Sequence, residues 1–314
     1  MAACRICGNV EKNHVFDVKE MLRGTRAIFQ YMECNSCKCV QIISIPKDMS
    51  SYYDNDVYGS FSSRKKDLVS EALRQLRNKY AIRKKGGLLG SVLSWVKPLP
   101  RDFTIVGEYA DKDSQILDVG CGAGDYVDDL VKIGYRNASG IDPFIGKDLV
   151  LESGGSVTKS YIEDVKGTYD IVLSHHSLEH VPNPLNTLVG IRKALTVGGV
   201  CILTVPVAEN LYRKYGSNCY LIQAPQHFYL FSIESIRILA QKAGFSIESV
   251  IRKIDTNFAW HVTSSLWEQD IASNEFQGTG IQLLNYDVRD ELSREFERLK
   301  QNDRGDNVIF ILKS

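Results

Sequence analysis

The sequence predicts an α/β protein, with a doubly wound and mainly parallel sheet behind a small N-terminal metal-binding module. Apolar runs of strand length alternate with helical patterns from Ser114 onward, which is typical of a parallel sheet covered on both faces. A turn with three glycines follows the first of these runs. Five of the eight cysteines lie before residue 40. These observations separate a cysteine-rich module from a larger α/β region.

Composition excludes several classes of protein. The 314 residues predict about two domains, and an apolar share of 44% argues against disorder. Lys plus Arg and Asp plus Glu number 38 each, so bulk electrostatics does not favour nucleic acid as a partner. The chain shows no signal-like apolar run and no stretch of the ~20 apolar residues that span a bilayer. We therefore expect a soluble, cytoplasmic protein.

The first cysteines form two pairs, Cys4-x-x-Cys7 and Cys34-x-x-Cys37. Two residues between thiolates let one tight turn direct both sulfurs at one ion, and two such turns complete a tetrahedral zinc site. Four thiolates leave no position for water, so this zinc is expected to be structural. Cys39 is a competing ligand, and a redox pair or unpaired buried cysteines are the alternatives.

We expect three regions along the chain. Residues 1–48 form the zinc-ribbon-like module, with a hairpin through 15–18 and 27–31 between the two cysteine pairs. Residues 49–105 form a connector that is rich in tyrosine, followed by a basic helix over 64–85. This helix is either a solvated face or an electrostatic clamp for a phosphorylated substrate. An apolar segment over 88–96 is a lid, a packing helix or a weak membrane-surface contact.

The third region, residues 106–314, holds the alternating elements. Strands are expected at 115–119, 138–141, around 157, 170–174, 200–205, 245–250 and 308–312. Helices are expected after the glycine turn, over 185–195 with a stop at Gly198-Gly199, and from the N-cap Ser232 to Gly244. Ligands of such sheets bind at the carboxyl ends of the strands.

The glycine turn reads Asp118-Val-Gly120-Cys-Gly122-Ala-Gly124-Asp125. Its glycines let a ligand approach the backbone closely. In the dinucleotide fingerprint G-x-G-x-x-G the third glycine would fall on Asp125, which would repel a pyrophosphate. Asp142 follows the next strand and is suited to two ribose hydroxyls. A nucleoside without pyrophosphate is the pattern of S-adenosylmethionine.

Three segments together resemble class I S-adenosylmethionine-dependent methyltransferases. Residues 116–124 resemble the first motif of that family, 170–184 the segment after its fourth strand, and 198–206 its fifth strand. The resemblance covers residues 114–250 and implies a Rossmann-like sheet of seven strands, with the last pairing antiparallel. It also implies S-adenosylmethionine as the cofactor. The cofactor contacts we assign are Asp118, Gly120, Gly122, Gly124, Asp142, Ile162, Glu163, Ser174, His175 and Tyr58.

The cysteine module narrows the resemblance to methyltransferases that act on sugars in surface-polysaccharide or antibiotic pathways. Residues 224–232 resemble a segment of that subgroup in which a histidine, here His227, faces the substrate. Ser177 stands where the C-methylating enzymes carry a tyrosine, which favours O-methylation. The expected acceptor is a small molecule or glycan, phosphorylated or nucleotide-linked. The alternatives are a small-molecule O-methyltransferase of another pathway, an RNA methyltransferase and a silent binding module.

Methyl transfer to a hydroxyl needs a base, because a protonated hydroxyl is a poor nucleophile. We assign this role to His180, with Glu179 orienting it or holding the acceptor and His227 positioning the acceptor. The alternative for Glu179 and His180 is a helix-capping network that shapes the loop. Of His175 and His176, one is expected to line the cofactor pocket and the other to pack in the core. Residues 251–306 match no motif.

Overall fold

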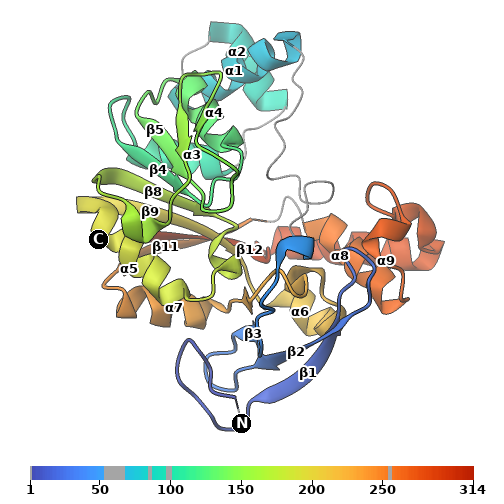
Figure 1. Ribbon diagram of the computed structural model, residues 1–314. Coiled ribbons are helices and arrows are strands. Elements are labelled where there is room, and N and C mark those ends of the chain that lie inside the picture. Colours follow the sequence, from blue (N-terminus) through green and yellow to red (C-terminus); the bar gives the residue numbers. More distant parts are fainter. Residues whose placement is uncertain (1, 53–67, 84–86, 97–100, 254–256) are drawn as a thin grey trace.

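Two sheets and their covering helices make up the part of the chain that the computed structural model describes, residues 2–52, 68–83, 87–96, 101–253 and 257–314. A four-stranded sheet lies at the N-terminal end, and an eight-stranded sheet forms the body of the molecule (Figure 1). The predicted α/β architecture is confirmed.

The strands of the large sheet lie in the order β11-β12-β9-β8-β4-β5-β7-β6. The five strands β9, β8, β4, β5 and β7 run parallel to one another, whereas β12 runs antiparallel to both β9 and β11. Their bounds are β4 (Ile116–Val119), β5 (Ala138–Ile141), β6 (Leu149–Val150), β7 (Ser156–Thr158), β8 (Tyr169–His175), β9 (Leu195–Pro206), β11 (Ser246–Lys253) and β12 (Asn307–Lys313).

The number of strands in this sheet and the start of β9 differ from what the sequence predicts. The count of seven strands is not confirmed, because the two-residue strand β6 pairs antiparallel with β7 and adds an eighth. The fifth predicted strand begins at Leu195 rather than Val200, because Leu195 already pairs with Tyr169 of β8. The register shifts before Val200 pairs with Ile171, so Gly198-Gly199 lies within a strand and does not end a helix.

Helices cover both faces of the large sheet (Figure 1). Successive residues of β12 face opposite sides of the sheet. Ile309 belongs to the apolar core with α3 and α4, and Phe310 belongs to the core with α5 and α7. This alternation explains why the strands read as continuous apolar runs. The helices are α1 (Leu68–Arg83), α2 (Gly87–Val96), α3 (Arg101–Tyr109), α4 (Asp125–Ile133), α5 (Pro184–Ala194), α6 (Asn210–Tyr215), α7 (Ile233–Lys242), α8 (Asn257–Glu268) and α9 (Tyr286–Gln301).

Local signals position these helices as predicted. The Ser232 hydroxyl accepts a hydrogen bond from the backbone of Ser235 and caps α7, and Gly244 follows that helix with φ +83°. The Asn183 side chain caps α5 in the same way, by accepting from the backbone of Asn186. Such caps satisfy backbone donors that the first helical turn leaves unpaired.

The N-terminal sheet has the order β1-β2-β3-β10, with bounds β1 (His14–Lys19), β2 (Ile28–Glu33), β3 (Val40–Ile42) and β10 (Tyr229–Leu230). The predicted hairpin is confirmed as β1 and β2, which pair antiparallel. The fourth strand comes from the α/β region, beyond the boundary expected at residue 48. Buried residues of both regions belong to one apolar core, so the module is packed onto the larger sheet.

The connector contains the helices α1 and α2. The predicted basic helix is present as α1, and its Arg74 forms an ion pair with Asp129 of α4. On α2, Leu88 and Trp95 are 83% and 84% exposed. The roles of α2 as a lid or a membrane-surface contact therefore stay predictions. Among the described residues, no helix is long and apolar enough to cross a membrane.

Candidate active site

The glycine turn lies between β4 and α4, where the strand order reverses between β4 and β8. Gly120, Gly122 and Gly124 have φ values of +76°, +55° and +80°, in the left-handed region that favours glycine. A Cβ on Gly120 would lie 2.5 Å from the Cβ of Ser177. The turn thus needs glycine both for its backbone conformation and for the close approach of the segment that follows β8.

Two buried aspartates flank this turn. The Asp142 carboxylate accepts hydrogen bonds from the backbone nitrogens of Gly122, at 3.0 Å, and Phe144, at 2.8 Å. The Oδ1 atom of Asp118 is buried and accepts no hydrogen bond from the described residues. Burial and the nearby charge of Asp142 raise the pKa of Asp118 to about 7. A buried carboxylate with an unused acceptor fits a cationic ligand group, such as the amino group of S-adenosylmethionine.

Serine hydroxyls join the segment after β8 to this turn. The Ser177 hydroxyl donates to the carbonyl oxygen of Val119 at 3.0 Å, and its oxygen lies 2.8 Å from that of Ser174. His175 contacts Thr204 through Nδ1, at 2.9 Å, and its ring packs against that of Tyr126 at an interplanar angle of 57°. Ser174 and His175 are thus tied into the strand ends, and their predicted cofactor contacts stay predictions. Tyr58 lies outside the described residues.

The structure brings together the three residues predicted to be catalytic. Glu179 and His180 belong to the short helical turn η4 (Leu178–His180), and His227 lies just before β10. A carboxylate oxygen of Glu179 and one ring nitrogen of each histidine lie within 4.8 Å of one another. The two imidazole rings meet edge to face with centroids 4.6 Å apart. We call these three residues the carboxylate–histidine cluster.

Backbone carbonyl groups orient both imidazoles of the cluster. Nδ1 of His180 lies 2.9 Å from the carbonyl oxygen of Gln226, and Nδ1 of His227 lies 2.7 Å from that of Leu221. A carbonyl oxygen can only accept, so each Nδ1 carries the proton and the lone pair of the neutral ring is on Nε2. Burial lowers the pKa of His180 and lowers that of His227 to about 3. Both rings are therefore neutral at neutral pH.

Glu179 is the buried anion of the cluster. Its side chain is 0% exposed, and the nearest basic atom is Nδ1 of His176, at 3.4 Å from Oε1. Burial opposes ionisation, but the interaction with His176 and the nearby imidazoles lowers the pKa of Glu179 to about 2. The site therefore holds a negative charge in its interior.

The N-terminal module supports the segment that carries His227. The Tyr31 hydroxyl of β2 donates to the carbonyl oxygen of His227 at 2.9 Å, and the backbone of Ile42 donates to Phe228 at 3.0 Å. The sequence does not mark Tyr31 as a residue of the site. No local signal can do so, because its partner His227 lies 196 residues away.

The four predicted cysteine ligands also meet. The Sγ atoms of Cys4 and Cys37 are 3.6 Å apart and those of Cys7 and Cys34 are 3.5 Å apart, with all four within 4.8 Å of one another. Zn–S bonds of about 2.3 Å in a tetrahedron put the sulfurs about 3.8 Å apart, so these residues, which we call the cysteine cluster, fit zinc. Cys39 is outside the cluster and donates to the carbonyl of Val40.

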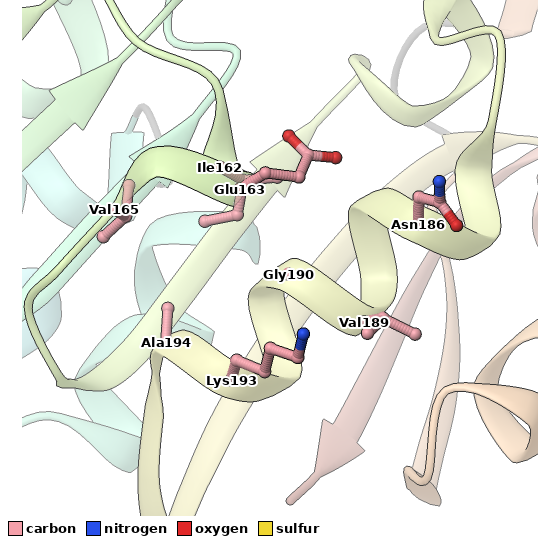
Figure 2. A pocket seen from close by; sticks show the side chains of 8 residues that line it. All are labelled: Ile162, Glu163, Val165, Asn186, Val189, Gly190, Lys193 and Ala194. Atoms are coloured by element: carbon pink, nitrogen blue, oxygen red, sulfur yellow. The ribbon is translucent and has the colours of Figure 1, made fainter.

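A cavity of about 310 Å³ lies between the turn η3 (Ile162–Asp164) and α5 (Figure 2). Ile162 and Glu163, both predicted cofactor contacts, line one wall, and Asn186 and Lys193 line the other. Neither the glycine turn nor the carboxylate–histidine cluster lines this cavity. The contacts of Ile162 and Glu163 with a cofactor stay predictions.

Comparison with known proteins identifies the family. A profile of the family described as "Methyltransferase domain" matches residues 92–250, just over half of the chain. The chain belongs to this methyltransferase family. The class I resemblance is thereby confirmed at the level of a methyltransferase domain.

Two curated relatives are also methyltransferases by name. The ubiquinone biosynthesis O-methyltransferase of Colwellia psychrerythraea is 35% identical over 99 residues, covering 28% of this chain and 40% of the relative. The enzyme of the same name from Vibrio parahaemolyticus is 34% identical over 122 residues, covering 34% and 50%. The chain thus spans half or less of the length of these relatives. Sugar-pathway enzymes are not among them.

Similar solved structures are distant. A phosphoethanolamine N-methyltransferase from Haemonchus contortus has 15% identity and a TM-score of 0.45, covering 96% of this chain and 67% of that one. An S-adenosylmethionine-dependent methyltransferase from Mesorhizobium loti has 13% identity and a TM-score of 0.42, covering 68% and 98%. Similarities at this level say nothing about the acceptor.

Proposed function

We propose that this chain transfers a methyl group from S-adenosylmethionine to a hydroxyl oxygen of a small-molecule acceptor. The observation that carries the proposal is the junction at Ser177. This residue touches Gly120 and bonds to Val119, and it lies two residues before Glu179. The carboxylate–histidine cluster is therefore adjacent to the turn that would hold the methyl donor.

The residues around the turn suit the donor, which supplies an electrophilic methyl group on a sulfonium. Asp118 would accept the cationic amino group, since its Oδ1 is buried without a partner among the described residues. Asp142 shapes the turn through Gly122 and can still accept from ribose hydroxyls, because each carboxylate oxygen has a second lone pair. The left-handed glycines let the ligand approach the backbone.

The cluster would activate the acceptor. His180 is neutral and its Nε2 carries a lone pair, so it can take the hydroxyl proton as the acceptor oxygen attacks the methyl carbon. The carbon–sulfur electron pair then leaves with the sulfur. Glu179 would stabilise the imidazolium that forms, and His227 would orient the acceptor. These roles are proposals, as is a single structural zinc ion in the cysteine cluster.

Two acceptors have support, and each is supported by a different observation. The segment 224–232 resembles sugar methyltransferases, which supports a sugar hydroxyl, nucleotide-linked or within a polysaccharide. The names of the curated relatives support O-methylation and an acceptor from ubiquinone biosynthesis. RNA has less support, because Arg74 of the basic helix already pairs with Asp129. We place the reaction in the cytoplasm as a prediction only.

Methyl transfer from labelled S-adenosylmethionine to separate panels of nucleotide sugars and of hydroxylated benzoquinone precursors would test this function. We expect label in one panel, with binding of S-adenosylhomocysteine measurable by calorimetry. Absence of S-adenosylhomocysteine binding would overturn the donor, and label in RNA alone would overturn the acceptor class. Label on carbon rather than oxygen would overturn O-methylation.

A further inference from the structure

The carboxylate–histidine cluster has the composition of a metal site as well as of a base. It offers two imidazole nitrogens and one carboxylate oxygen, which lie within 4.8 Å of one another. Two histidines and one carboxylate are a donor set that binds first-row divalent cations and leaves further coordination positions open. The cluster differs in this respect from the cysteine cluster, whose four thiolates complete a tetrahedron.

The burial of the Glu179 carboxyl group supports a cation at this place. Neither carboxylate oxygen accepts a hydrogen bond from the described residues, although the side chain is 0% exposed. The nearest basic atom is Nδ1 of His176, 3.4 Å away, and that residue is itself 43% exposed. A buried carboxylate without hydrogen bonds is costly unless a charge or a metal compensates it.

The orientation of the imidazoles is a second, independent observation. Each histidine of the cluster directs Nδ1 at a backbone carbonyl, that of Gln226 for His180 and that of Leu221 for His227. Metal-binding histidines typically donate their second ring nitrogen to a carbonyl or carboxylate in this way, which fixes the tautomer and turns the other nitrogen to the metal. Two imidazoles arranged so, beside a buried carboxylate, are suited to share one ion.

We propose that Glu179, His180 and His227 bind a first-row divalent cation, at a site separate from the cysteine cluster. Bonds of about 2.1 Å put neighbouring ligand atoms about 3 to 3.5 Å apart. The three ligand atoms already lie within 4.8 Å of one another, which is compatible with this geometry after small side-chain shifts. His180 is the partly exposed member of the three.

This inference rests on the proposed function for its consequence. An acceptor hydroxyl bound to the cation loses its proton to solvent more readily than in water, and the resulting oxygen attacks the methyl carbon. Without the cation, Nε2 of His180 takes that proton, as proposed above. With the cation bound, Nε2 is a ligand and the proton goes to solvent instead. Open adjacent positions favour an acceptor with two neighbouring oxygens, such as a vicinal diol or an ortho-dihydroxy ring.

Manganese binding tests the site without relying on activity. Protein with its zinc retained is titrated with MnCl₂, and free Mn²⁺ is followed by electron paramagnetic resonance. Thiolates bind Mn²⁺ poorly compared with nitrogen and oxygen ligands, so the cysteine cluster does not contribute. We expect one Mn²⁺ per chain, and Glu179→Gln and His227→Ala to weaken binding by at least about tenfold.

The matched control is His14→Ala, which removes an exposed histidine of β1 and should leave Mn²⁺ binding unchanged. Zinc content and thermal melting report whether each variant is folded, and a second substitution, His227→Gln, replaces any variant that is not. Failure of the wild type to bind Mn²⁺, or equal binding by folded Glu179→Gln and His227→Ala, would overturn the proposal. Methyl transfer that persists in chelator would leave the proposed function in place and overturn the role of the cation in the reaction.

Discussion

The two clusters of potential ligands in this protein are built in different ways. The cysteine cluster draws all its members from residues 4–37, on two short turns that each bring two sulfurs together. The carboxylate–histidine cluster draws on two segments, after β8 and before β10, that only the tertiary fold brings into contact. The first set is closed and suits a structural role, whereas the second has three members and room for a reacting molecule.

The two clusters are nevertheless linked. Tyr31, between the two cysteine pairs in the sequence, donates to the carbonyl of His227, and the Ser232 hydroxyl donates to the carbonyl of Cys37. The cysteine module therefore supports one wall of the candidate active site. Four experiments test how the candidate active site and the cysteine cluster differ and whether they depend on each other.

The largest effect is expected for Cys37→Ser. Losing one of four thiolates should release the zinc and remove a large part of the folding free energy of the module, on the order of several kcal/mol. Metal analysis and thermal melting would show this. Cys39→Ser is the matched control, because Cys39 is buried nearby but lies outside the cluster. Zinc retained by Cys37→Ser and lost from Cys39→Ser would show that the ligand set is wrong.

The next largest effect is expected for His180→Ala. Removal of the group that activates the acceptor should lower turnover by about 10²–10⁴, because general base catalysis contributes that much. Affinity for S-adenosylmethionine should stay nearly unchanged, as calorimetry would measure. Turnover within about threefold of the wild type would contradict any role of His180 in proton removal.

A smaller effect is expected from the protonation of Asp118. Its pKa of about 7 is raised above the ordinary value, so its contribution to the free energy of unfolding falls as pH rises from about 4 to about 7. A cationic amino group needs the ionised carboxylate, so the Kd for S-adenosylmethionine should be about tenfold weaker at pH 6 than at pH 8. Asp118→Asn should abolish this dependence. An unchanged pH profile in the variant would contradict the assignment.

The smallest effect is expected for Tyr31→Phe. One hydrogen bond to the carbonyl of His227 is lost, with a net contribution of about 1 kcal/mol. The KM for the acceptor should rise a few-fold, while zinc content and donor affinity stay constant. Tyr109→Phe is the control, because it removes a tyrosine hydroxyl that bonds only to the surface residue Glu248 on the other side of the large sheet. Equal changes in both variants would show that the module does not support the active site.

Much of the fold could be predicted because its signals are local. The hairpin of the module, the capped start of α7 and the three left-handed glycines each depend on residues within a few positions of one another. The strand predictions that were wrong depend on pairing between strands that are distant in the sequence. Strand β6 exists only because β7 offers an edge, and Leu195 extends β9 only because it meets Tyr169 of β8.

The candidate site divides in the same way. The residue types and their order could be predicted from motifs, since Glu179 and His180 follow one strand and His227 follows another. The contact between them, the backbone carbonyls that orient the imidazoles, and the support from Tyr31 could not. The Gln226 carbonyl lies 46 residues from His180 in the sequence, and Tyr31 lies 196 residues from His227. The Leu221 carbonyl is six residues from His227, in an irregular segment that no periodic pattern marks.

By itself, the sequence determined the two cysteine turns, the glycine turn, the order of strands and helices, and the methyltransferase family. Each of these depends on backbone conformation or on periodic burial over a few residues, which local composition encodes. That β10, from the α/β region, completes the sheet of the cysteine module is visible only in the tertiary structure. The tertiary structure also decided that Glu179 is buried among three histidines and that Asp118 is desolvated, because ionisation and ligand geometry depend on every group that packs nearby.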